Sequence, residues 1–192
     1  MTDKAKLRSG GRSARIQTSV HLAVDTLLAE IGRTALTIPI IAERAGVTPS
    51  TIYRRWGDLA ELLGDVAVQR LRPVSDPVDT GSVSGDLQAW SMQFADEMSS
   101  VPGRTMLRDI FAGTTDSKNP RFCCAFTDQQ LRLIDQRAID RGEPGFDVDL
   151  FIDQVVAPIL YRILFRDAPL SMSYCQQLLD RAQPAVHGPV TP

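Results

Sequence analysis

The sequence predicts an all-α protein of about nine helices, with an N-terminal three-helix unit and a larger C-terminal helical unit. Apolar residues recur at helical spacing nearly everywhere, and no stretch alternates apolar and polar residues as a half-buried strand does. Proline and glycine stand in each gap between these stretches, where helices are expected to end. The distribution of charge also divides the chain into two parts.

Charge is distributed unevenly along the 192 residues, although the net charge is only −2. Residues 1–56 contain nine Lys or Arg and four Asp or Glu, which gives +5, whereas the remainder contains 12 and 19, which gives −7. A basic module on an acidic body indicates a polyanionic partner for the N-terminal part. Parts of a chain can also differ in charge by chance, so charge alone does not decide whether such a partner exists.

The first helix is predicted from an apolar stripe that ends at Gly32, a residue type common at helix C-termini. The stripe consists of Ile16, Val20, Ala23, Val24, Leu27, Leu28 and Ile31. A basic tail with glycine and serine precedes this helix. Its cationic residues are Lys4, Lys6, Arg8, Arg12 and Arg15.

Three short helices follow, and each has a recognisable start. Thr37 is a suitable N-cap for the second helix, which Gly46 ends. Thr48 caps the third helix, and Pro49 takes its first position, where a missing N–H costs nothing. Asp58 caps the fourth helix.

The segment 72–86 is rich in Pro, Gly, Ser and Asp and is predicted to be a linker or a long loop. It separates the basic part from the acidic part. Further helical stretches are predicted near residues 87–101, 106–111, 120–141, 147–166 and 171–183. We expect one domain over residues 1–57 and a second over residues 58–192.

The second and third helices form a helix-turn-helix pattern. Each has fewer than ten residues, and the turn between them contains Gly46, which can adopt a positive φ. The third helix carries exposed hydroxyl and guanidinium groups that suit phosphates, and an arginine can reach guanine O6 and N7 in the major groove. The pattern therefore predicts binding to double-stranded DNA.

The stretch LTIPIIAERAGVTPSTIYRRWGDLAELL resembles the TetR family of bacterial transcription regulators, and the likeness covers about residues 12–68. The resemblance implies that Tyr53 contacts the DNA backbone and that Trp56 packs as well as borders DNA. Leu59 departs from the family, which often has a phosphate-binding lysine there. The family's N-terminal domain binds DNA, and its C-terminal helical domain binds an effector and dimerises.

The expected DNA contacts come mainly from the third helix. They are Arg12, Thr37, Thr48, Pro49, Ser50, Thr51, Tyr53, Arg54, Arg55 and Trp56. For some of these residues a different role stays open. Arg54 and Arg55 also fit a solvated helix face, Tyr53 fits a core position, and Thr37 can serve only as a helix cap.

The predicted helix between residues 150 and 164 is apolar almost all round, so it needs packing partners on more than one side. One side can face its own core, and the other can face the same helix of a second subunit. The expected interface residues are Ile152, Val156, Ile159, Ile163 and Leu178. A buried helix in a monomer is the alternative. A symmetric dimer predicts a palindromic operator.

An effector pocket is expected among the C-terminal helices, lined by aromatic and methionine side chains. The candidates are Trp90, Phe94, Met98, Met106, Phe111, Phe122, Phe126 and Tyr161. No buried charged anchor stands out, so a small, largely apolar effector is expected. Each of these residues also fits ordinary core packing.

Catalytic and metal-binding patterns are weak in this sequence. Neither histidine has a Cys or His neighbour at ligand spacing, and GSVSG has valine where a G-x-S-x-G elbow needs serine. We expect no metal, no cofactor and no enzymatic activity. The chain shows no secretory or membrane-spanning segment, and its three cysteines form no C-x-x-C, so a cytoplasmic location without a membrane partner is expected.

These observations predict a ligand-responsive, DNA-binding transcription regulator, favoured to be a repressor that binds its operator as a homodimer. The main alternative is a helical small-molecule-binding protein that has lost specific DNA binding, and Leu59 supports it. A helical enzyme acting on an apolar substrate is disfavoured, because no positioned acid–base pair is visible.

Overall fold

The computed structural model describes residues 4–113, 117–166 and 169–182, with side chains from Gly11, and all regular structure in these residues is helical. The helices are α1 (Lys4–Ile31), α2 (Ile38–Ala45), α3 (Pro49–Trp56), α4 (Leu59–Leu71), α5 (Val83–Ser99), α6 (Val101–Phe111), α7 (Asn119–Asp140), α8 (Val148–Phe151), α9 (Ala157–Phe165) and α10 (Met172–Ala182). A π-helical turn, Ile152–Val156, joins α8 to α9 in one continuous helix. Counted in this way, and with the short 3₁₀ turn Arg33–Ala35 left out, the described residues form nine helices, which confirms the all-α fold. None of these helices is long and apolar enough to cross a membrane.

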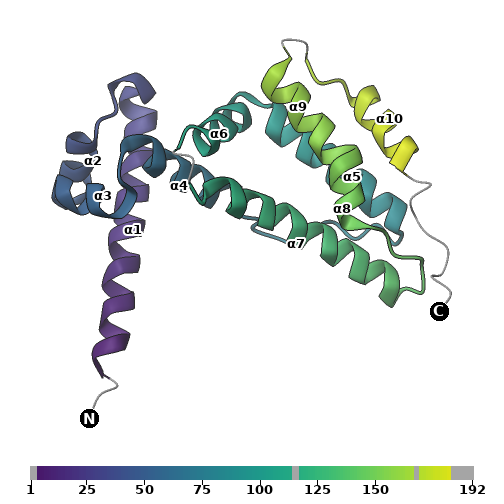
Figure 1. Ribbon diagram of the computed structural model, residues 1–192, viewed down its shortest axis with the longest axis horizontal. Coiled ribbons are helices and arrows are strands. Elements are labelled where there is room, and N and C mark those ends of the chain that lie inside the picture. The colour runs from purple at the N-terminus through teal and green to yellow at the C-terminus, as the bar shows by residue number, and fades with distance from the viewer. Residues whose placement is uncertain (1–3, 114–116, 167–168, 183–192) are drawn as a thin grey trace.

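The first four helices form the N-terminal unit. α2 packs against α1, α3 packs against α2 and α4, and the beginning of α1 projects beyond them (Figure 1). The first half of α4 completes the buried cluster. Its members are Val20, Ala23, Val24, Leu27, Leu36, Ile38, Ile41, Ala42, Ile52, Trp56, Leu62, Leu63 and Val66.

The basic segment at the start of the chain is helical, because α1 begins at Lys4. The prediction of a tail before the first helix is therefore wrong. Gly10 and Gly11 each cost only about 1 kcal/mol in a helix interior. The Lys, Ala, Leu and Arg residues around them favour a helix, and each residue added to an existing helix costs less than starting a new one.

The predicted ends of the short helices are confirmed. Gly46 ends α2 with φ at +67°, in the left-handed region that glycine adopts without strain. Asp58 caps α4 by accepting a hydrogen bond from the Glu61 N–H at 2.9 Å. Thr37 and Thr48 hold the N-cap positions of α2 and α3, but neither side chain accepts a hydrogen bond from its helix.

α5 is the central helix of the C-terminal unit, because it packs against α6, α7, α9 and α10. The buried cluster around it is larger than the N-terminal one. Its members are Val83, Leu87, Trp90, Ala95, Met98, Leu107, Leu131, Ile134, Ala138, Val148, Phe151, Val155, Val156, Ile159, Ile163, Cys175, Leu178, Leu179 and Ala182.

The segment predicted to be a linker, 72–86, is a strap held against α7, and α5 begins within it. Arg137 of α7 donates a hydrogen bond to the Pro77 carbonyl at 2.6 Å. Arg141 lies 3.0 Å from the fully buried carboxylate of Asp86. Composition predicted a linker or a long loop here, and could not show the residues that hold it, because they lie more than fifty positions further along the chain.

α4 joins the two units, because its two halves pack in different places. Leu62 and Leu63 belong to the N-terminal cluster, whereas Ala67 and Val68 pack with Ile110 of α6. The two units therefore share α4, and the domain boundary at residues 57 and 58 stays a prediction.

Two ion pairs connect α1 and the turn that follows it to α4 and α6. Arg33, in the turn after α1, pairs with the buried carboxylate of Asp109 on α6. Burial raises the pKa of the Asp109 carboxyl, and Arg33 offsets part of that rise. Arg70 of α4 pairs with Asp25 of α1 at 2.5 Å.

Candidate DNA-binding surface and effector cavity

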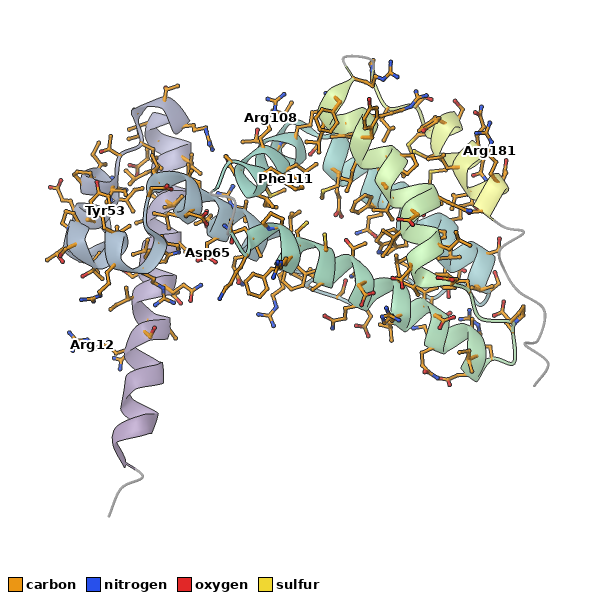
Figure 2. All side chains as sticks on the ribbon, in the orientation of Figure 1. Arg12, Tyr53, Asp65, Arg108, Phe111 and Arg181 are labelled. Carbon is orange, nitrogen blue, oxygen red and sulfur yellow. The ribbon has the colours of Figure 1, made fainter. Side chains whose placement is uncertain are left out.

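α3 presents polar side chains on one side and buries apolar ones on the other. Ile52 is fully buried, whereas Tyr53 is 51% exposed. Figure 2 shows Tyr53 on the outer side of the N-terminal unit. Pro49 and Ser50 are exposed at the start of the helix. The helix therefore has a free face of the kind that enters a DNA groove.

Three hydroxyl groups gather at the N-terminus of α3. The Thr48 Oγ1 atom lies 2.9 Å from Ser50 Oγ and 3.0 Å from Thr51 Oγ1. The first N–H groups of a helix have no partner within the helix, and its dipole favours anions there. Hydroxyl and backbone donors together suit a DNA phosphate.

The two arginines of α3 have different surroundings. Arg54 is exposed and has no hydrogen bond or ion pair within the described residues. Arg55 donates to α1 at three acceptors: the Ser13 carbonyl at 3.1 Å, Ser13 Oγ at 2.7 Å and Gln17 Oε1 at 2.6 Å. Arg54 is thus available to DNA as it stands, whereas Arg55 is engaged with α1.

Trp56 lies in the core, and a polar network surrounds its indole N–H. That N–H donates to Asp65 Oδ2 of α4 at 2.7 Å, and His21 Nε2 of α1 lies 2.9 Å from the same oxygen. Burial alone would raise the pKa of the Asp65 carboxyl, but the hydrogen bonds from His21 and Trp56 hold that pKa below its usual value. Packing of Trp56 is confirmed. The expectation that it also borders DNA stays a prediction, and only 9% of the residue is exposed to make such a contact.

The other predicted DNA contacts lie around α3. Thr37 is exposed directly before α2, and Arg12 is exposed on α1. Figure 2 shows Arg12 pointing to the side of α1 on which Tyr53 lies. Leu59 is half-buried and packs against the N-terminal cluster, so its position strengthens the core and offers no phosphate donor.

A cavity of about 370 Å³ lies between the end of α4, the strap, α5, α6 and α7. Five of the predicted effector residues line it: Trp90, Phe94, Met98, Met106 and Phe126. The other three do not. Phe111, Phe122 and Tyr161 are each more than half exposed. Helical periodicity identifies them as apolar but does not say which side of each helix faces the cavity.

The cavity wall combines stacked aromatic rings with amide groups. Trp90 and Phe94 stack with their ring centroids 5.1 Å apart. The Trp90 indole N–H donates to Gln130 Oε1 at 2.8 Å, and Gln130 donates to the strap at the Ser75 carbonyl. Cys123 also lines the cavity, and burial raises the pKa of its thiol to about 11, which makes it a poor nucleophile.

The side chains predicted for a dimer interface face the core of their own chain. Val156, Ile159, Ile163 and Leu178 are at most 7% exposed. Their burial leaves these four side chains little surface for a second subunit, whereas Ile152 is partly exposed, and the interface assignment itself stays a prediction. The outer side of α9 instead exposes Tyr161 and Phe165, whose rings lie 5.3 Å apart.

Two family descriptions match this chain, one for each unit. "Bacterial regulatory proteins, tetR family" matches residues 24–66, and "Tetracyclin repressor-like, C-terminal domain" matches residues 77–182. The chain belongs to the TetR family. The first match contains α2 and α3, and the second runs from the strap to the end of α10.

Relatives and solved structures agree with this TetR-family membership. The chain is 30% identical over 182 residues to the HTH-type transcriptional regulator YdeS of Bacillus subtilis (strain 168), and this alignment covers 91% of each protein. It is 26% identical over 159 residues to the regulator Mb1581 of Mycobacterium bovis (strain ATCC BAA-935 / AF2122/97), covering 80% of this chain and 79% of that one. The solved structure of the TetR family transcription regulator SCO0332 matches with a TM-score of 0.63 and 26% identity. The match covers 92% of this chain and 99% of that one.

Sequence patterns did not reveal the polar network around Asp65 or the Arg33–Asp109 ion pair. The only signal for Asp65 was a charged residue among the apolar residues of the fourth helix. Its partners come from α1 and α3, so only the packing of the three helices brings them together.

Proposed function

We propose that this protein is a homodimeric transcription repressor. It binds a palindromic DNA operator through α3 and releases that operator when a small, largely apolar molecule occupies the cavity beside α5. The observation that carries the proposal is the free face of α3, where Arg54 and the Thr48 hydroxyl cluster lie together in a complete helix-turn-helix. An arginine in the major groove can donate to both guanine acceptors.

Helix α4 connects the cavity to the DNA-binding unit. Arg70 and Leu71 at the end of α4 form part of its wall, and the other end of α4 belongs to the N-terminal cluster. An effector that binds one position of α4 more tightly than another would shift the population toward that position. In a dimer, this shift changes the spacing between the two α3 helices.

The alternative of a binding protein without DNA affinity has less support. It rests on Leu59, which takes the place of a phosphate-binding lysine. The half-buried Leu59 side chain packs against the N-terminal cluster, and the donors of α3 are exposed.

The test is fluorescence anisotropy with duplex DNA from the region upstream of the gene, with a scrambled duplex for comparison, at several salt concentrations. Arg54→Ala should weaken operator binding at least about tenfold, with little effect on the scrambled duplex. Arg108→Ala is the matched control, because Arg108 is also an exposed arginine but lies on α6, away from α3 (Figure 2). Equal binding of the wild-type protein to both duplexes would instead favour the alternative.

A further inference from the structure

An open groove lies between the first part of α1 and the turn that precedes α3. It has a volume of about 730 Å³ and is lined by Gly11, Arg12, Arg15, Ile16, Ser19, Ala45 and Val47. The hydroxyl of Ser19 donates to the Ala45 carbonyl at 2.7 Å, which joins α1 to the end of α2 beside this groove. Two lining residues are cationic and none is acidic, so the groove suits an anion.

The groove is continuous with the face of α3 that the proposed function assigns to DNA. Val47 directly precedes Thr48, which belongs to the hydroxyl cluster at the start of α3. Arg12 and Tyr53 lie on the same side of the molecule (Figure 2). Arg12 is exposed and has no hydrogen bond or ion pair in the described part of the chain.

Arg55 connects α3 to α1 close to these cationic residues. Its guanidinium donates to Ser13 and Gln17, which directly follow the groove residues Arg12 and Ile16 in the sequence. The guanidinium also lies 5.1 Å from the centre of the Trp56 ring. Gln17 in turn donates to Asp65 at 3.3 Å, so the connection continues to α4.

We propose that residues 11–19 of α1 form a second DNA-contacting element. In it, Arg12 and Arg15 bind the sugar-phosphate backbone next to the major groove that α3 enters, and Arg55 is the positioning residue that holds this element against α3. Because the guanidinium of Arg55 is directed at α1, this residue acts through Arg12 and Arg15. The proposal rests on the proposed function, since it extends the same DNA surface.

The charge of this element is tested by the salt dependence of operator binding. The double variant Arg12→Ala/Arg15→Ala removes up to four phosphate contacts from a dimer. The slope of log affinity against log salt should therefore become less negative by about 3 to 4. The ratio of operator to scrambled affinity should stay unchanged, because phosphate contacts carry no sequence information. Arg12→Lys/Arg15→Lys should keep the slope. Arg108→Ala/Arg121→Ala, which removes two exposed arginines from α6 and α7, should leave it unchanged.

The positioning role of Arg55 is tested by a double-mutant cycle. Arg55→Met keeps an apolar stem near Trp56 but removes all three hydrogen bonds to α1. If Arg55 acts by holding α1, the slope change caused by Arg12→Ala/Arg15→Ala should shrink to less than half in the Arg55→Met background. Thermal unfolding of each variant shows that the folds compared are intact.

Two results would overturn the inference while leaving the proposed function standing. One is selective operator binding by wild-type protein with an unchanged salt slope in Arg12→Ala/Arg15→Ala. The other is a slope change from Arg12→Ala/Arg15→Ala that is the same in the Arg55→Met background as in wild type. That result would make Arg55 an independent DNA contact. Failure of the proposed function looks different, because the wild-type protein would then bind operator and scrambled DNA equally.

Discussion

At the scale of single residues, Asp65 links three helices of the DNA-binding unit. Its carboxylate accepts hydrogen bonds from Trp56 of α3 and from Gln17 of α1, and it pairs with His21 of α1. Charged acceptors make stronger hydrogen bonds than neutral ones, and a partly buried network loses more than one bond when its centre is changed. The position of α3 on α1 and α4 therefore depends on this charge.

Asp65→Asn should lower the free energy of unfolding by about 2 kcal/mol at pH 7, because the amide cannot satisfy all of these donors. The folded-state pKa of Asp65 lies below its unfolded value, so its stabilisation is present above about pH 4 and is lost as pH falls through the folded pKa. Urea denaturation at pH 7 and pH 3 should show the difference between wild type and variant narrowing at the lower pH.

The control for this experiment is Asp96→Asn, which changes an exposed carboxylate on α5. It should alter stability by less than about 0.5 kcal/mol at either pH. A difference between Asp65→Asn and wild type that stays constant from pH 7 to pH 3 would contradict the assigned role of the charge.

At the scale of the elements, the close approach of α4 to α6 and α7 needs a glycine. A Cβ at Gly64 would lie 2.5 Å from the Asn119 amide nitrogen and 3.1 Å from the Asp109 carbonyl oxygen. The amide is the end of a side chain and can move, but the carbonyl is part of the α6 backbone. The contact between the two units is therefore sensitive to a single methyl group.

Gly64→Ala should destabilise the protein by about 1–3 kcal/mol, because overpacking outweighs the better helix propensity of alanine. Thermal denaturation measures the change. Gly11→Ala is the matched control, since a Cβ there meets no atom within 4 Å and should stabilise α1 slightly. If both substitutions stabilise the protein equally, α4 is not closely packed at Gly64.

At the scale of the whole molecule, the described chain leaves an aromatic face on α9 largely exposed. Tyr161 is 56% exposed and Phe165 71% exposed. Neighbouring arginines lie over aromatic rings, with Arg162 3.7 Å from the Tyr174 ring centre on α10. A surface that combines aromatic rings and arginines is typical of interface centres, so we propose it as the dimer interface.

Phe165→Asp should convert the dimer to a monomer, because it places a charge on the most exposed aromatic residue of this face. Sedimentation at several protein concentrations would detect the change. Affinity for the palindromic operator should fall at least about tenfold, while binding to a single half-site should stay near its wild-type level. Phe122→Asp tests specificity, since Phe122 is an exposed aromatic residue on α7. Dissociation by Phe122→Asp alone would place the interface on α7.

Much of the fold is local in origin and could be predicted from the sequence. Gly46 and Asp58 mark helix ends through backbone conformation and capping, which depend only on neighbouring residues. The helix-turn-helix and its exposed face could be predicted for the same reason. The N-terminal extension of α1 could not, since competing local preferences there are nearly balanced.

By itself, the sequence determined the all-α class, the helix-turn-helix and the family. Only the tertiary structure decided which side of each helix faces the core and which side stays exposed. The helix containing Ile159 is apolar all round, so its pattern could not show that the core takes one side and leaves Tyr161 outside. Arg54 and Arg55 are adjacent and identical in type, yet only Arg55 meets α1. The physical reason is the same in both cases: a side chain's role depends on partners that lie far away in the sequence and meet it only when the helices pack.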